Sequence, residues 1–156
     1  MPKIDIAQAE VRLGSNYPAP FDVPCRARQR SRLGAAAGLS QFGVNLLRLS
    51  PGTWSSQRHW HTIEDEFVWV IEGEVVLVTE EGEQVLRAGE CAGFAAGVAN
   101  GHHLQNRSNR EAVLLEVGSS RPEQDGCFYP DVDLMIAPGT DTFSHRDGRP
   151  YLQDES

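Results

Sequence analysis

Short apolar runs separated by polar turns fill the middle of the chain. The runs are rich in β-branched and aromatic residues, which favour strands. Turn residues recur about every 8–12 residues, a spacing typical of an antiparallel sandwich or barrel. The pattern therefore predicts an all-β fold with strands at residues 44–49, 66–71, 75–79, 85–87, 91–95, 102–106 and 112–117.

The two ends of the chain lack this alternation. Prolines in residues 1–41 exclude a long helix, so we expect an irregular N-terminal arm with at most a helical turn within 4–13. Residues 119–156 are polar again, and Phe143 and Tyr151 are the side chains best suited to anchor them. We expect a C-terminal tail folded over the barrel, with at most one helical turn at 134–137.

Length and charge narrow the class of protein. A chain of 156 residues fits one domain, which we expect to span residues 1–156 with a barrel core at about 42–118. The net charge of −8 argues against nucleic-acid binding, which needs cations to neutralise phosphates. The sequence shows no apolar run of membrane-helix length and no signal-peptide pattern, and its three cysteines are far apart. We expect a cytoplasmic protein with reduced thiols and no membrane or nucleic-acid partner.

Four basic residues alternate in the N-terminal arm. In an extended chain, Arg26, Arg28, Arg30 and Arg32 lie on one face. They fit either a solvated edge that discourages aggregation or an arm that docks on an acidic surface of its own or a partner subunit.

The histidines carry the candidate chemistry. His59 and His61 are two residues apart, so in a strand they point to the same face and can share a metal ion. Glu66 opens the next apolar run, and a bend before it would bring its carboxylate beside them. Imidazole and carboxylate ligands suit divalent ions such as Zn, Mn, Fe or Ni. A second pair, His102 and His103, follows about 40 residues later.

The spacing around these histidines resembles the two motifs of the cupin superfamily. The first motif is matched by glycine, histidine and glutamate residues in order: Gly52, His59, His61, Glu66 and Gly73. The second is matched at Gly89, Gly97, His102 and Asn106, with Ala95 in place of the usual proline and two extra residues before the histidine. The resemblance implies a double-stranded β-helix, the cupin or jelly-roll barrel, with one metal ion held by His59, His61, Glu66 and His102.

Other residues have expected roles of lesser weight. His102 rather than His103 is the expected ligand, because strand neighbours point to opposite faces and the spacing to Asn106 selects it. Asp65 is the alternative acidic ligand. We expect Cys91 to be a small buried hydrophobe. Arg48, Gln57 and Arg58 are candidates to meet an anionic substrate at the barrel mouth, and His103 and His145 are candidate bases, so the catalytic residues stay open.

The resemblance is to small bacterial cupins, some of them named as sugar-phosphate isomerases. It implies a metalloenzyme that acts on a sugar, sugar phosphate or enolisable acid, with the metal as Lewis acid. A non-catalytic sensor or small-molecule-binding protein and an Fe(II) dioxygenase are the alternatives. We also expect a homodimer, because Phe67, Trp69 and Ile71 form a second apolar strand face beyond what the barrel interior can hold.

Overall fold

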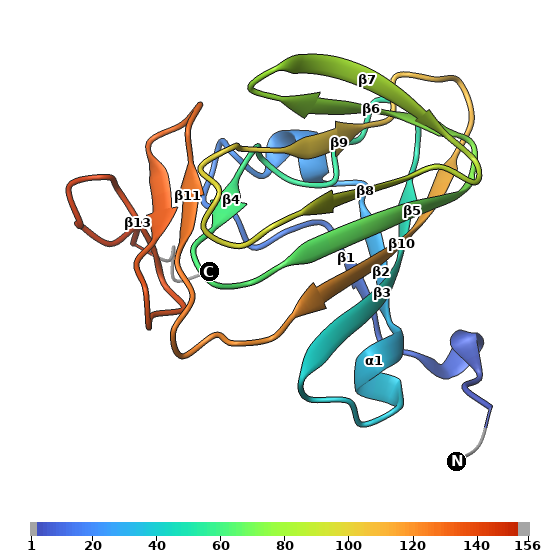
Figure 1. Ribbon diagram of the computed structural model, residues 1–156, viewed down its shortest axis with the longest axis horizontal. Coiled ribbons are helices and arrows are strands. Elements are labelled where there is room, and N and C mark those ends of the chain that lie inside the picture. The colour runs from blue at the N-terminus through green and yellow to red at the C-terminus, as the bar shows by residue number, and fades with distance from the viewer. Residues whose placement is uncertain (1–2, 153–156) are drawn as a thin grey trace.

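The computed structural model describes residues 3–152 as a β-structure dominated by one large antiparallel sheet (Figure 1). This sheet has the order β1-β2-β3-β10-β5-β8. Its strands are β1 (Val11–Leu13), β2 (Gln29–Arg32), β3 (Phe42–Leu49), β5 (Glu66–Glu72), β8 (Cys91–Phe94) and β10 (Ala112–Ser119). The two longest strands, β3 and β10, pair along their whole length.

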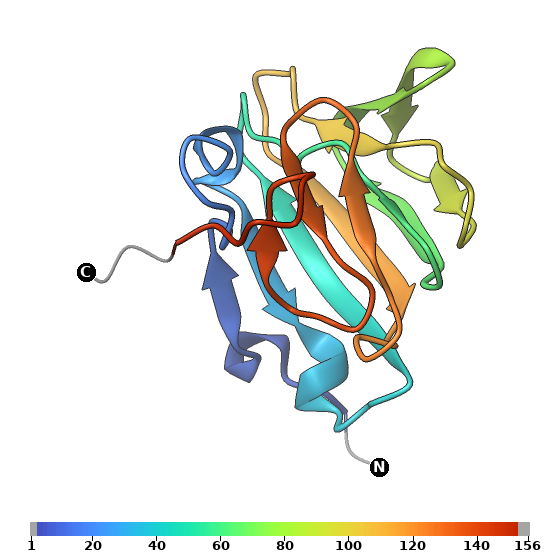
Figure 2. The same cartoon turned by 90° about the vertical axis from the view of Figure 1, so that its left-hand side faces the viewer.

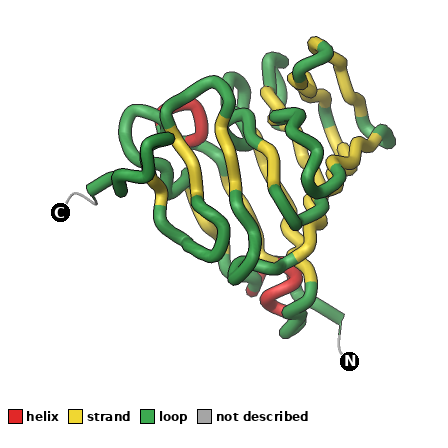
Figure 3. The backbone as a smooth tube through the Cα atoms, turned by 60° about the vertical axis from the view of Figure 1, so that its left-hand side comes forward, coloured by secondary structure: helices red, strands yellow, loops and turns green. Residues whose placement is uncertain are grey.

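Two smaller sheets complete the barrel. One has the order β7-β6-β9 and contains β6 (Glu74–Thr79), β7 (Gly82–Arg87) and β9 (His103–Gln105). The other has the order β13-β12-β11-β4 and contains β4 (Trp60–His61), β11 (Cys127–Tyr129), β12 (Leu134–Ile136) and β13 (Phe143–Ser144). The four-stranded sheet faces one side of the large sheet (Figures 2 and 3). The fold is therefore all-β, as the strand pattern predicts, and has the jelly-roll arrangement of antiparallel sheets that the resemblance implies.

Two apolar clusters hold these layers together. The larger one lies inside the barrel and includes Leu47, Val70 and Leu114, which are fully buried. The smaller one lies under the C-terminal strands around Cys127, Tyr129 and Leu134. Phe143 and Tyr151 pack against this second cluster, which confirms them as anchors of the tail. The cluster therefore fixes the tail beside the barrel cavity.

The ends of the chain are more regular than the sequence predicts. The N-terminal arm contributes β1 and β2 to the large sheet, besides short helices at Ile6–Gln8, Val23–Cys25 and Leu33–Ala36. The tail forms β11, β12 and β13, so the helical turn expected at 134–137 is wrong. These strands have two to four residues, too few for a hydrophobic period to mark them.

The prediction of a solvated arginine edge is wrong for the inner two arginines. Arg30 forms an ion pair with Glu116 of β10 and is half-buried, and Arg28 is buried. The arm thus docks on the chain's own acidic residue. Arg26 pairs with the half-buried Asp22, and Arg32 pairs with the exposed Glu10.

Cys91 is exposed, contrary to the expectation of a buried thiol. It lies opposite Trp69 in the β5–β8 pairing, so it shares the outward face of the sheet. Val68 and Val70 of β5 point inward and are buried, whereas Phe67, Trp69 and Ile71 are exposed. The alternation of β5 therefore leaves an apolar outer face, as the sequence predicts.

Among residues 3–152, no helix is both long and apolar enough to cross a membrane.

Candidate metal centre

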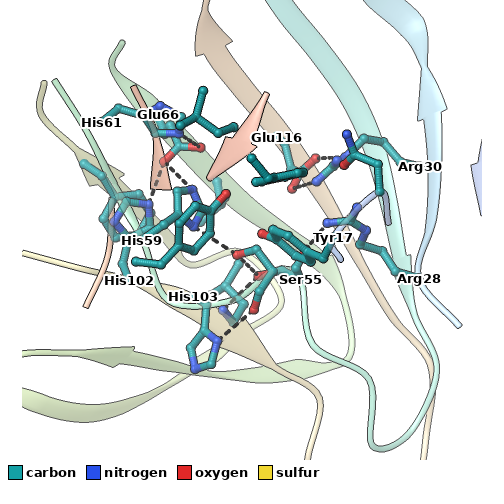
Figure 4. A pocket seen from close by; sticks show the side chains of 18 residues that line it. Tyr17, Arg28, Arg30, Ser55, His59, His61, Glu66, His102, His103 and Glu116 are labelled. Atoms are coloured by element: carbon teal, nitrogen blue, oxygen red, sulfur yellow. Dashed lines mark hydrogen bonds and ion pairs between the residues drawn. The ribbon is translucent and has the colours of Figure 1, made fainter. Parts of the chain in front are cut away.

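Four side chains from three segments of the chain meet inside the barrel. We call His59, His61, Glu66 and His102 the donor set (Figure 4). His59 and His102 form an antiparallel bridge, His61 lies in β4, and Glu66 begins β5. Glu66 is at the centre: its Oε2 lies 3.5 Å from His59 Nε2 and 2.6 Å from His102 Nε2, and its Oε1 lies 3.6 Å from His61 Nε2. The bend expected before Glu66 therefore does bring the carboxylate back to the histidines.

The opposite ring nitrogens of these histidines face oxygen acceptors. His59 Nδ1 donates to the Gln57 carbonyl at 2.8 Å, and His61 Nδ1 donates to Asp125 at 2.6 Å. His102 Nδ1 lies 3.4 Å from the Asn100 carbonyl. A proton held on Nδ1 leaves the Nε2 lone pair free toward the shared centre.

Packing further fixes the orientation of the rings. Phe94 stacks on His102 with the ring planes at 1° and the centroids 3.6 Å apart. Tyr129 packs against His59 with centroids 5.6 Å apart. Asp125 is buried and also accepts the main-chain N–H groups of Ile63 and Glu64, so its carboxylate is held in place before it meets His61.

This arrangement fits a single divalent ion. Ligand atoms bound to one ion at about 2.0–2.2 Å lie roughly 3 Å from one another, close to the observed separations. Three overlapping groups of donors come within reach of a metal here: His59 with Glu66 and His102, His59 with His61 and Cys127, and His61 with Glu64 and Asp125. The first of these groups contains three members of the donor set, and His61 adjoins it through Glu66.

The charges in the donor set are coupled. Burial disfavours the Glu66 carboxylate, but the surrounding histidines outweigh it and hold its pKa well below the usual range. Burial likewise opposes a charge on His61, yet Glu66 and Asp125 together raise its pKa to about 9. Burial lowers the pKa of His102. Without a metal, the Glu66 carboxylate is therefore balanced by a protonated His61, and a divalent cation bound there would take the place of that proton.

His103 faces away from the donor set. Its Nδ1 lies 2.9 Å from the Ser56 carbonyl, and its Nε2 lies 2.9 Å from the Gln105 amide nitrogen. Both ring nitrogens are thus occupied, and the ring packs edge-on against Trp54. His103 is buried rather than solvated, and its hydrogen bond to Ser56 ties β9 to the loop before β4 at the edge of the cavity described below.

The other candidates lie outside the donor set. Asp65 accepts the Ala96 N–H on the protein surface. His145 hydrogen-bonds Asp133 and stacks on Tyr151. Neither residue lines the cavity described below.

A cavity of about 280 Å³ adjoins the donor set. Its walls include the donor set, Tyr17, Arg28, Arg30, Glu116 and Tyr129. Burial raises the pKa of both tyrosines, so their hydroxyl groups stay protonated.

The prediction that Arg48, Gln57 and Arg58 line the mouth of the barrel cavity is wrong. Arg48 pairs with Glu111, and Arg58 pairs with Asp131 and Glu80. Gln57 donates to the Phe21 carbonyl, and none of these three predicted residues lines the cavity. Arg28 and Arg30 take their place, because β2 joins the large sheet and brings the N-terminal arm to the cavity. The alternation of arginines in the N-terminal arm was the one sequence feature that pointed to Arg28 and Arg30. It does not show which surface these side chains contact.

Comparison with known proteins agrees with this architecture. The Cupin domain family matches residues 45–118. A sugar phosphate isomerase of the cupin superfamily from Silicibacter pomeroyi is 46% identical, covers 98% of each chain and superposes with a TM-score of 0.89. A proposed sugar phosphate isomerase from Acidithiobacillus ferrooxidans is 29% identical, with 81% of this chain and 76% of that chain covered and a TM-score of 0.66.

A more distant structure shares the fold alone. The polyketide cyclase RemF from Streptomyces resistomycificus is 14% identical, with 99% of this chain and 88% of that chain covered and a TM-score of 0.62. A search of curated proteins found no match.

Proposed function

Because the chain belongs to the cupin superfamily, we propose that it is a metal-dependent enzyme acting on a small oxygenated metabolite. The substrate would be a sugar, a sugar phosphate or an enolisable acid, and an isomerisation is the reaction we favour. The observation that carries the proposal is the donor set, in which His59 and His61 turn their Nε2 atoms toward the Glu66 carboxylate. The similar protein from Silicibacter pomeroyi, described as a sugar phosphate isomerase, supports the substrate class.

The ligands in this proposal are His59, His61, Glu66 and His102, and the ion is one divalent metal such as Zn, Mn, Fe or Ni. When bound, the metal supplies Lewis acidity that polarises a substrate oxygen. Glu66 neutralises part of its charge, and Asp125 holds His61 in the tautomer that leaves Nε2 free.

The remaining walls of the cavity position the substrate. Tyr17 and Tyr129 keep their protons and can donate hydrogen bonds to substrate oxygens. Val68, Leu104 and Ile136 supply apolar surface that limits the water in the cavity. The cavity of about 280 Å³ suits a small metabolite rather than a polymer.

The test combines metal analysis of anaerobically purified protein with a screen of sugars, sugar phosphates and enolisable acids. We expect turnover with the metal-loaded protein and no turnover after His59→Ala with His61→Ala. Binding without turnover would instead favour a non-catalytic binding protein. Substrate-dependent oxygen consumption by the Fe(II) form would favour a dioxygenase.

A further inference from the structure

The cavity contains a buried cation without a carboxylate partner. Arg28 is 7% exposed and lines the cavity. Its guanidinium donates to two main-chain carbonyl oxygens: Nε and Nη2 reach Gly14 at 3.1 and 2.9 Å, and Nη1 reaches Ser55. Within residues 3–152, Arg28 forms no ion pair, so only the dipoles of these carbonyl groups compensate the positive charge of its guanidinium.

The neighbouring Arg30 provides the contrast. Its Nε and Nη2 donate to the two carboxylate oxygens of Glu116 at 2.7 and 3.0 Å, which neutralises the pair. Both carboxylate oxygens of Glu116 are therefore used by Arg30, and no carboxylate in the described part of the chain neutralises the charge of Arg28. A buried charge without a counter-ion is costly, and buried charges in proteins are normally paired.

The position of Arg28 indicates what would pair with it. Figure 4 shows Arg28 and Arg30 across the cavity from the three histidines of the donor set. A neutral side chain could anchor Gly14 and Ser55 through the same carbonyls without burying a charge. A guanidinium at a cavity wall has the further property of binding oxyanions through paired N–H groups.

We propose that Arg28 binds the anionic group of the substrate, a phosphate or a carboxylate, while an oxygen at the other end of the molecule faces the donor set. The inference rests on the proposed function for the reacting end of the substrate. It narrows the class of substrate, because a neutral sugar has no anionic group for Arg28 to bind. Arg28 is then a specificity residue of the cavity.

The experiment measures the affinity of inorganic phosphate and, in parallel, acetate by calorimetry at constant ionic strength. It uses both metal-loaded and metal-free protein and four variants. Arg28→Gln removes the charge, Arg28→Lys keeps the charge without the fork, and Glu116→Gln frees Arg30. Arg32→Gln is the matched control, because Arg32 belongs to the same alternating series but pairs with Glu10 outside the cavity.

We expect Arg28→Gln to weaken binding of at least one anion by about tenfold or more and Arg28→Lys to weaken it less, because a charge-assisted pair is lost only in the first. Arg32→Gln should bind as the wild type does, and Glu116→Gln should bind more tightly. The anion that depends on Arg28 identifies the phosphate or the carboxylate class.

Wild-type affinity for both anions in a folded Arg28→Gln protein would overturn the inference. If Arg28→Gln fails to fold, Arg28→Lys decides, because it keeps the charge but loses the paired N–H groups, and wild-type affinity for both anions in that variant would then overturn the inference. Metal content is measured separately in every variant. Arg28-dependent anion binding in a chain that binds no metal would refute the proposed function but support this inference.

Discussion

At the scale of single residues, the candidate site depends on hydrogen bonds that a motif does not show. The resemblance to the cupin motifs predicted that His59, His61, Glu66 and His102 come together, and the structure places them side by side. Asp125 and Arg28 could not be predicted. Each lies on a segment outside the motifs and reaches the site only through the packing of the tail or the arm.

The first prediction concerns metal content. We expect about one divalent ion per chain, and the double variant His59→Ala with His61→Ala should lose most of it because it removes two of the four proposed ligands. Elemental analysis measures the metal content of the wild type and of the double variant, in protein never exposed to a chelator. Metal content equal to that of the wild type would refute the proposed ligand set.

The second prediction separates the adjacent histidines. His102 Nε2 faces Glu66, whereas both nitrogens of His103 are engaged elsewhere. His102→Ala should therefore weaken metal binding by more than about 100-fold, beyond the range typical of residues that only orient a ligand. His103→Ala should cost stability but leave metal affinity nearly unchanged. Competition with a chelating dye measures the two affinities, and the reverse order would contradict the prediction.

The third prediction concerns the carboxylate behind His61. Asp125→Asn should lower metal affinity by about 10–100-fold, because the amide no longer attracts the Nδ1 proton of His61. Asp133→Asn is the control, since Asp133 forms a similar bond to His145 away from the cavity. Equal affinities in the two variants would show that Asp125 does not position His61.

At the scale of elements, the sequence pattern located the strands between residues 42 and 119, except the two-residue β4, but not the short strands of the arm and the tail. The strands β3, β5, β6 and β10 have six to eight residues, enough for a period of two to emerge. The arm strand β2 is Gln-Arg-Ser-Arg, and its half-buried arginine Arg30 is stabilised by an ion pair rather than by apolar contact. A polar strand of this kind gives no hydrophobic signal, so its place in the sheet could not be predicted.

The fourth prediction tests the turn between β5 and β6. Gly73 has φ of 77°, and a Cβ there would lie 2.7 Å from the Glu111 carbonyl oxygen. Gly52 has a similar φ of 82°, but a Cβ at Gly52 would meet no atom within 4 Å. Both alanine variants should lose about 1–2 kcal/mol for the left-handed backbone, and Gly73→Ala should lose more because of the contact. Urea unfolding compares them, and equal losses would rule out a steric role for Glu111.

At the scale of the whole molecule, the outer face of β5 remains apolar. Phe67, Trp69 and Ile71 are 38%, 48% and 45% exposed, and Cys91 lies beside Trp69. Contiguous apolar patches on soluble proteins commonly mark interfaces. We propose that a second copy of this chain covers the face.

The fifth prediction follows from that proposal. The protein should be a homodimer at micromolar concentration, and Trp69→Lys should make it a monomer by placing a charge in the interface. Leu13→Lys is the control, because Leu13 is 70% exposed on β1, away from this face. Light scattering gives the masses, and a monomeric wild type would contradict the proposal.

The pairing of β4 with β11 also has a consequence for the order of events during synthesis. His61 lies on a two-residue strand whose ladder partner is Cys127–Tyr129, and its hydrogen-bond acceptor is Asp125. All four proposed ligands leave the ribosome before these residues do. At about 5–20 residues per second, the nascent chain spends seconds with its ligands made but His61 unsupported. We therefore expect tight metal binding to begin only after the tail has emerged. The ligands are synthesised first, and the site becomes complete later.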